Sequence, residues 1–177
     1  MNEREITLRI LIAEDETIIR LDLRALLERS GFEVCGEAKD GEEAVELARS
    51  LAPDLAIMDV KMPRLDGIEA ARRILDERPI PIVMLTAYGQ EELVSRAVEA
   101  GVFGYLVKPF REQDLLPAIR TATARHADLL RSRGGGRSFD VQLPSARGTG
   151  WPLTFDRRPD GSVRVSLREP QRETDSP

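Results

Sequence analysis

The chain has 177 residues and 41% of them are hydrophobic, which is enough for one domain of ordinary size and an appendage. Its formal net charge of −5 argues against wholesale nucleic-acid binding, although residues 1–130 carry 17 basic and 25 acidic side chains while residues 131–177 carry 9 and 6. A single cysteine excludes an internal disulfide. The N-terminal residues lack the apolar stretch of a secretion signal, and no apolar run approaches the about 20 residues of a membrane span, so a cytoplasmic protein with no membrane contact is expected.

Short apolar segments alternate with amphipathic ones along residues 7–130, and these predict strands and helices respectively. Strands are predicted at 8–13, 33–38, 55–59, 80–86 and 103–107, and helices at 16–29, from 41 onward, 67–77, 91–100 and 112–130. The segment 33–38 alternates between apolar and polar residues, which is typical of an edge strand, whereas the other four are continuously apolar. Five such strand–helix repeats indicate parallel pairing with right-handed crossovers and helices on both faces, a doubly wound α/β fold.

Local signals also mark the ends of two helices. The first predicted helix places Ile18, Leu21 and Leu26 on one face, and Gly31 follows it as a C-terminal cap. The second begins at Asp40, where the run Asp-Gly-Glu-Glu resembles a capping box.

The composition changes after residue 130. Residues 131–138 are rich in Gly, Arg and Ser and predict a flexible linker. Residues 139–177 have few apolar side chains, so the tail is expected to be mostly disordered. The one segment of the tail that could be ordered is a hairpin at 151–167, because apolar segments flank a Pro-Asp-Gly turn there. A lone hairpin has only marginal stability in water. The sequence therefore predicts a domain at 1–130, a linker and a tail.

Polar residues stand at the carboxyl ends of four predicted strands, the edge where doubly wound sheets bind ligands. They are Glu14 and Asp15 after the first strand, Asp59 at the end of the third, Thr86 at the end of the fourth and Lys108 at the end of the fifth. Three carboxylates brought close together repel one another unless a cation lies among them. Hard oxygen ligands of this kind favour Mg²⁺.

A carboxylate beside Mg²⁺ can attack a phosphoryl group, because the metal neutralises charge on the group being transferred. Asp59 is the natural nucleophile, since it ends the central strand and carboxylates form aspartyl phosphates. Lys108 offers a positive charge to a phosphate oxygen and Thr86 offers a hydroxyl donor. Each residue alone has a simpler explanation, such as helix capping or a surface charge. Together, at matching strand ends, they favour a phosphoryl-transfer site.

Four segments carry a resemblance to a known family: Ile10–Glu16 (ILIAEDE), Asp54–Gly67 (DLAIMDVKMPRLDG), Val83–Ala87 (VMLTA) and Gly104–Phe110 (GYLVKPF). On these segments, residues 7–128 resemble the receiver domain of two-component response regulators. The resemblance implies the flavodoxin-like, CheY-like fold, with five parallel strands in the order 2-1-3-4-5.

The resemblance also implies roles in phosphorylation. Asp59 would be phosphorylated by a histidine kinase or a phosphotransfer protein. The main-chain carbonyl of Lys61 would join Glu14, Asp15 and Asp59 in binding Mg²⁺.

A second set of implied roles concerns the switch. Thr86 would turn toward the phosphate, Tyr105 would turn inward behind it, and the bond between Lys108 and Pro109 would be cis and seat the ammonium. The surface of the fourth helix and fifth strand would then be remodelled, and would bind a downstream protein partner or a second copy of the chain.

The sequence says less about the output, that is, about how the chain acts on downstream partners. Residues 12–20 and 118–125 resemble regulators with a C-terminal ANTAR domain, which bind RNA and prevent transcription termination. No three-helix RNA-binding pattern or helix-turn-helix follows residue 130, so the main prediction is a receiver that acts through protein contacts. An RNA-binding antitermination regulator that acts through its C-terminal segment is the alternative. A phosphorylation-independent interaction module is disfavoured by the complete set of site residues. An enzyme with a diffusible substrate is not expected, because no candidate histidine base lies near the site and the chain shows no nucleotide-binding glycine loop.

Overall fold

The computed structural model describes residues 8–87, 91–102, 104–131, 139–142, 152–157 and 163–167. The chain divides into two units, Met1–Leu130 and Arg131–Pro177. Among the described helices, none combines the length and the apolar character needed to cross a membrane.

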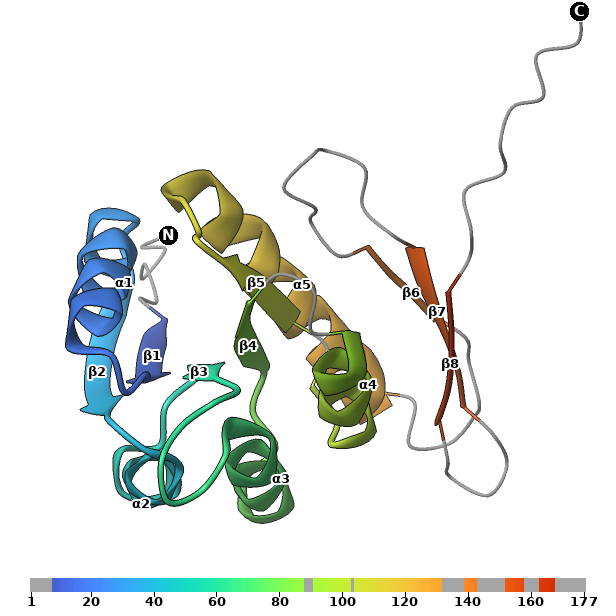
Figure 1. Ribbon diagram of the computed structural model, residues 1–177, viewed down its shortest axis with the longest axis horizontal. Helices are drawn as coiled ribbons and strands as arrows, with labels where there is room; N and C mark the ends of the chain where they lie inside the picture. The colour runs from blue at the N-terminus through green and yellow to red at the C-terminus, as the bar shows by residue number, and fades with distance from the viewer. Residues whose placement is uncertain are drawn as a thin grey trace, which may run out of the picture. The chain divides into compact units, whose positions relative to one another are not determined.

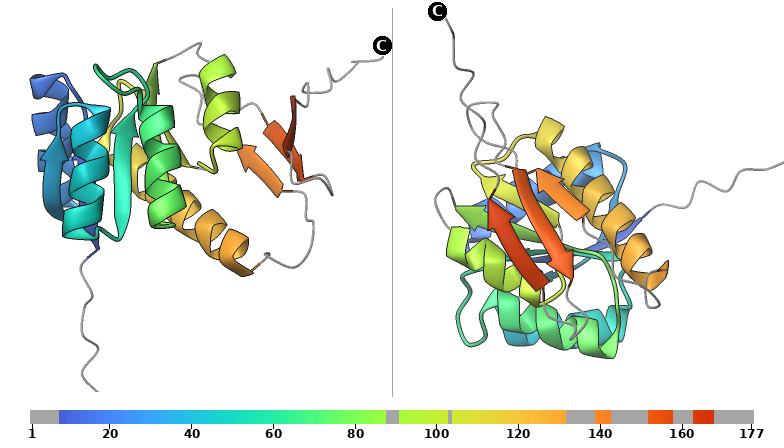
Figure 2. Two further views of the ribbon diagram at one scale, coloured as in Figure 1. Left: turned by 90° about the horizontal axis from the view of Figure 1, so that it is seen from below. Right: turned by 90° about the vertical axis from the view of Figure 1, so that its right-hand side faces the viewer.

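Strands and helices alternate along the N-terminal unit (Figure 1). Their bounds are β1 Arg9–Ala13, α1 Thr17–Arg29, β2 Glu33–Ala38, α2 Gly41–Leu51, β3 Leu55–Asp59, α3 Gly67–Glu77, β4 Ile82–Ala87, α4 Glu91–Glu99, β5 Gly104–Lys108 and α5 Glu112–Arg131. The sheet has the order β2-β1-β3-β4-β5 and all its neighbouring strands are parallel. Helices α1 and α5 cover one face, and α2, α3 and α4 cover the other (Figures 1 and 2). The predicted doubly wound α/β fold is confirmed.

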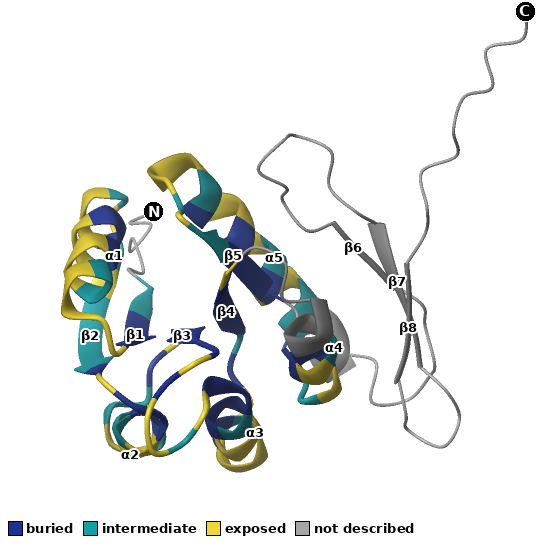
Figure 3. Cartoon of the chain, in the orientation of Figure 1, coloured by how far each residue is buried: buried dark blue, intermediate teal, exposed yellow. Residues whose placement is uncertain are grey.

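The central strands are buried on both faces, as their continuous apolar runs require (Figure 3). The edge strand β2 is mostly half-buried, in keeping with its alternating sequence. The core that packs against α1 and α5 draws on alternate strand residues and on one stripe of each helix: Ile10, Ile12, Leu23, Leu26, Leu27, Leu55, Ile57, Val83, Leu85, Leu106, Leu115, Ala118, Ile119 and Ala122.

The predicted N-cap of α2 at Asp40 is confirmed, and the capping-box pattern is shifted by one residue, because Glu43 bonds the N–H of the residue before the N-cap. Asp40 Oδ1 accepts a hydrogen bond from the Glu43 main-chain N at 2.9 Å, and Glu43 Oε2 accepts one from the Lys39 main-chain N at 2.9 Å. The predicted cap after α1 is confirmed as well, because Gly31 follows the helix with a φ of 85°, which glycine adopts without steric cost.

The inward face predicted for α1 is wrong in part. Ile18 is 83% exposed and Leu21 is 55% exposed, whereas Leu26 is buried together with Leu23 and Leu27. The last three are spaced i, i+3 and i+4 and define the stripe that meets the sheet. At 3.6 residues per turn, Leu21 and Ile18 lie about 160° and about 140° around the helix axis from Leu23. Both therefore point away from the core.

The C-terminal unit contains a three-stranded antiparallel sheet in the order β6-β7-β8. Its strands are β6 Phe139–Gln142, β7 Pro152–Arg157 and β8 Val163–Leu167. The pair β7–β8 lies where the sequence suggests a hairpin, and β6 adds a strand that the sequence analysis did not include. Of the expected linker and disordered tail, residues 132–138, 143–151, 158–162 and 168–177 lie outside the described part of the chain.

Candidate functional site

The fold gathers the polar strand-end residues at one edge of the sheet. Asp59 is the last residue of β3 and Lys108 is the last residue of β5. Glu14 and Asp15 directly follow β1, and Thr86 is the penultimate residue of β4. Because these four strands are parallel neighbours, their carboxyl ends meet at the same edge, where the sequence analysis expected a site.

Three carboxylates come together at this edge. Glu14, Asp15 and Asp59 each offer one oxygen, and these oxygens all lie within 4.8 Å of one another. Glu14 is fully buried and Asp59 is 8% exposed, whereas Asp15 faces solvent. Buried carboxylates this close require a cation or several hydrogen-bond donors.

Lys108 supplies one such cation. Its Nζ lies 2.6 Å from Glu14 Oε2 and 3.2 Å from Asp59 Oδ2. The short contact to Glu14 pairs its fully buried carboxylate with the Lys108 ammonium. With all groups ionised, three carboxylates and one ammonium leave a local charge of −2. A divalent cation bound by oxygen atoms fits both the charge and the donor set.

Burial dominates the protonation behaviour of the site. It raises the pKa of the Glu14 and Asp59 carboxyl groups, and the nearby Lys108 ammonium opposes this rise in both cases. Burial alone would lower the pKa of Lys108, but the two carboxylates outweigh it and the pKa is raised. Lys108 therefore remains a cation whenever its partners are ionised.

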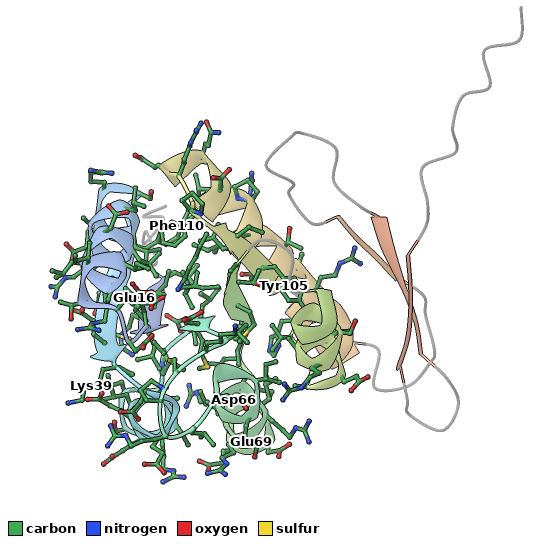
Figure 4. The ribbon with its side chains drawn as sticks, in the orientation of Figure 1. Glu16, Lys39, Asp66, Glu69, Tyr105 and Phe110 are labelled. Carbon is green, nitrogen blue, oxygen red and sulfur yellow. The ribbon has the colours of Figure 1, made fainter. Side chains whose placement is uncertain are left out.

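The loop after β3 packs closely against its surroundings. A Cβ atom at Gly67 would overlap the main-chain oxygen of Asp59, and the Gly67 N–H donates to the Val60 carbonyl at 2.9 Å. Asp66 caps α3 by accepting a hydrogen bond from the Glu69 N–H at 2.9 Å (both labelled in Figure 4). Only glycine permits this approach, and it fixes the backbone that carries Asp59 and the segment that follows.

An open cavity of about 490 Å³ adjoins the carboxylates. Its lining comes from one residue after β1, the β3–α3 loop, α3 and α4: Asp15, Val60, Lys61, Met62, Pro63, Asp66, Ile68 and Arg96. Lys61, expected to offer its carbonyl to a metal, lines the same cavity as Asp15. Arg96 Nη2 lies 3.9 Å from Asp66 Oδ2.

The remaining predicted residues surround this cluster. Thr86 is 4% exposed and its hydroxyl donates to the Ala87 carbonyl at 3.2 Å. Tyr105, on β5 (Figure 4), is also 4% exposed, and its hydroxyl donates to the Val102 carbonyl at 3.0 Å. Burial raises the pKa of the Tyr105 phenol. The bond between Lys108 and Pro109 is cis.

Sequence reasoning missed two arginine contacts near the site. Arg20 Nη1 donates to the main-chain oxygen of Glu14 at 2.6 Å. Arg64 forms an ion pair with the buried Asp40, which the sequence suggested only as a helix cap. A basic residue in the first turn after the acidic pair is a signal for the first contact. The second joins two loops distant in sequence, and no local pattern indicates it.

Comparison with known proteins gives one consistent result. Residues 10–120 match the family model of the response regulator receiver domain. The transcriptional regulatory protein PdtaR of Mycobacterium tuberculosis is 56% identical over 139 residues, which cover 78% of this chain and 68% of that protein. The chemotaxis protein CheY of Thermotoga maritima is 38% identical over 112 residues, which cover 63% of this chain and 93% of CheY.

Solved structures agree with the sequence matches. The signal receiver domain of a modulated diguanylate cyclase from Desulfovibrio desulfuricans is 34% identical with a TM-score of 0.64, and the match covers 70% of this chain and 99% of that one. The signal receiver domain of the putative response regulator NarL from Mycobacterium tuberculosis is 27% identical with a TM-score of 0.63. That match covers 67% of this chain and 97% of the NarL domain.

Proposed function

The chain belongs to the response regulator receiver family of two-component systems, and from this premise we propose that Asp59 is its phosphoryl acceptor. The observation that carries the proposal is the position of Asp59. It is a nearly buried carboxylate at the end of a central strand, within 4.8 Å of two other acidic oxygens and 3.2 Å from an ammonium. This combination suits a nucleophile that must receive a highly charged group.

Mg²⁺ is the proposed cofactor. Side-chain oxygens of Glu14, Asp15 and Asp59, with the main-chain carbonyl of Lys61, would hold it. The local charge of −2 and the clustering of three carboxylate oxygens within 4.8 Å of one another support this assignment. When bound, the ion would neutralise charge on the phosphoryl oxygens during transfer.

The chain's own residues then have defined tasks. One Oδ of Asp59 forms the new bond to phosphorus while the bond from phosphorus to the imidazole nitrogen of a phosphohistidine breaks, and the imidazole leaves with the bonding electron pair. Lys108 holds a phosphoryl oxygen by charge, and the Thr86 hydroxyl donates to another. The donor is a histidine kinase or a phosphotransfer protein.

Phosphorylation would change the surface to which partners bind. A phosphoryl group on Asp59 would carry a charge of roughly −2 in place of the single charge of the carboxylate, and its oxygens would draw the Thr86 hydroxyl toward them. Tyr105, already buried in this structure, would fill the space that Thr86 leaves. The face formed by α4 and β5 would bind a downstream protein or a second copy of the chain with altered affinity, since only differential contacts shift the population. The protein would act as a signalling switch and not as an enzyme with a diffusible substrate.

One observation favours a second candidate for the output. The chain is 56% identical over 139 residues to a protein named as a transcriptional regulator. The alternative is an RNA-binding antitermination regulator that acts through residues 131–177. Salt-sensitive RNA binding that disappears when these residues are deleted would support it, and no binding at low salt would exclude it.

The proposed acceptor chemistry is tested with a small phosphodonor such as acetyl phosphate. We expect ³²P incorporation that requires Mg²⁺ and stops when the ion is chelated. Labelling that is equally fast in a chelator would contradict the metal assignment. Full labelling of Asp59→Ala would contradict the acceptor assignment.

A further inference from the structure

Arg20 touches the main chain of both acidic residues that follow β1. It is the fourth residue of α1, and its side chain is only 17% exposed. Its Nη1 donates to the Glu14 carbonyl oxygen at 2.6 Å and lies 3.5 Å from the Asp15 carbonyl oxygen. A guanidinium group presents several donors in a fixed plane, so it can hold two neighbouring carbonyl groups in one orientation.

The guanidinium is itself anchored from the neighbouring strand. Arg20 Nε lies 3.5 Å from Glu37 Oε2, and Glu37 stands on β2 directly opposite Ile12 of β1. Glu37 also accepts a hydrogen bond from Arg24 Nη1 at 2.6 Å through its other oxygen. The pairing of β1 with β2 therefore positions Glu37, and the Glu37 carboxylate in turn holds the Arg20 guanidinium.

Few other hydrogen bonds within the described part of the chain order the turn between β1 and α1. Glu16, at the N-cap position (labelled in Figure 4), makes no side-chain capping hydrogen bond. The Glu16 N–H donates instead to Glu14 Oε1 at 3.1 Å, which uses an oxygen of the acidic cluster itself. The Glu14 N–H donates to the Ala38 carbonyl at 3.0 Å. Repulsion among the clustered carboxylates acts against this geometry unless the main chain is held from outside.

We propose that Arg20 is a positioning residue of the metal and phosphoryl-acceptor site. By binding the carbonyl groups of Glu14 and Asp15, it fixes the directions in which their side chains leave the main chain. This assignment rests on the proposed function, because it concerns the same metal site. Arg20 acts from behind the ligands, as residues that orient metal ligands do in other sites.

Arg24 provides a matched control. It carries the same charge, stands one helical turn further along α1 and binds the same Glu37 carboxylate, but its hydrogen bonds go to Glu37 and Glu28. Arg20→Ala and Arg24→Ala each remove one positive charge and one contact with Glu37. Only the Arg20 variant loses the contacts with the acidic pair.

The test measures Mg²⁺ affinity by titration calorimetry on the full chain. We expect Arg20→Ala to raise the dissociation constant about tenfold, the scale typical of residues that orient metal ligands, and Arg24→Ala to stay within about twofold. Arg20→Lys, which keeps the charge and one donor, should recover part of the loss. It also serves as the test variant if Arg20→Ala does not fold.

Amide hydrogen exchange in metal-free protein gives a second readout. Exchange at Asp15 and Glu16 should be faster in the Arg20 variants than in wild type, and unchanged in Arg24→Ala. Equal affinities and equal exchange in the Arg20 and Arg24 variants would overturn the assignment, as would tighter Mg²⁺ binding in Arg20→Ala. Wild-type protein that bound no Mg²⁺ would overturn the proposed metal site as well, so the two failures are distinguishable.

Discussion

The ammonium of Lys108 lies 2.6 Å from Oε2 of Glu14, a side chain with no solvent exposure. Replacing Lys108 by Met would leave this buried carboxylate without its cation. We expect the free energy of unfolding in metal-free buffer to fall by about 3 kcal/mol, as for other broken buried ion pairs. Added Mg²⁺ should recover part of the loss, because a ligand that binds only the folded state stabilises it. Urea unfolding with and without Mg²⁺ measures both effects.

Lys39→Met is the control for this experiment, since Lys39 is an exposed lysine in the loop before α2. Its substitution should change the unfolding free energy by less than about 0.5 kcal/mol. Equal losses in the two variants would contradict the role given to Lys108.

The glycine at position 67 is required by the backbone of Asp59. Gly67→Ala places a Cβ atom on the main-chain oxygen of Asp59, so we expect a destabilisation of about 3 kcal/mol, at the upper end for overpacking, and weaker Mg²⁺ binding. Gly31→Ala is the comparison. Its added Cβ would meet no atom within 4 Å, and its positive φ alone should cost about 1 kcal/mol. Equal tolerance of alanine at both positions, in thermal and urea unfolding, would show that the close contact is unimportant.

Tyr105 should make the free energy of unfolding depend on pH in the alkaline range. The phenol of an unfolded chain loses its proton near about pH 10, whereas burial raises the pKa of Tyr105 in the folded protein. Above that pH the folded state binds more protons than the unfolded state, so its stability falls as pH rises. The contribution of Tyr105 is about 1.4 kcal/mol per pH unit.

Tyr105→Phe isolates this contribution from those of other titrating groups. Below pH 9 the variant should be less stable by about 1 kcal/mol, because the hydrogen bond to the Val102 carbonyl is lost. Between pH 10 and 11 the difference should shrink or reverse. Urea unfolding at a series of pH values checks this. A constant difference between the two proteins would mean that Tyr105 titrates in the folded state as it does in the unfolded chain.

The sheet was predictable from sequence because strands buried on both faces leave continuous apolar runs. Details that depend on tertiary contacts were not. Strand β4 was expected from Ile80 but begins at Ile82, since the intervening Pro81 has no N–H to offer to a ladder. The inward stripe of α1 was misplaced at Ile18 and Leu21, because leucines surround that helix and only packing decides which of them meet the sheet.

At the functional site, too, the features set by strand order were predictable and those set by tertiary contacts were not. Asp59 and Lys108 could be predicted as neighbours, since parallel strands bring their carboxyl ends to one edge whatever lies between them. The ion pair of Arg64 with Asp40 could not, because it depends on a loop in which Arg64 has a φ of 65°, a conformation that non-glycine residues seldom adopt. Local patterns carry no information about such loop geometry.

The location of the phosphoryl group tests the central claim most directly. Wild-type protein, Asp59→Asn and Asp66→Asn would be treated with acetyl phosphate and Mg²⁺, and the modified residue identified by peptide mass spectrometry after borohydride trapping. Asp66 is the matched control, because it lines the adjoining cavity and asparagine preserves a helix cap. We predict a single modified aspartate at position 59 in wild type and in Asp66→Asn, and none in Asp59→Asn. A modified Asp66, or undiminished modification of Asp59→Asn, would contradict the account.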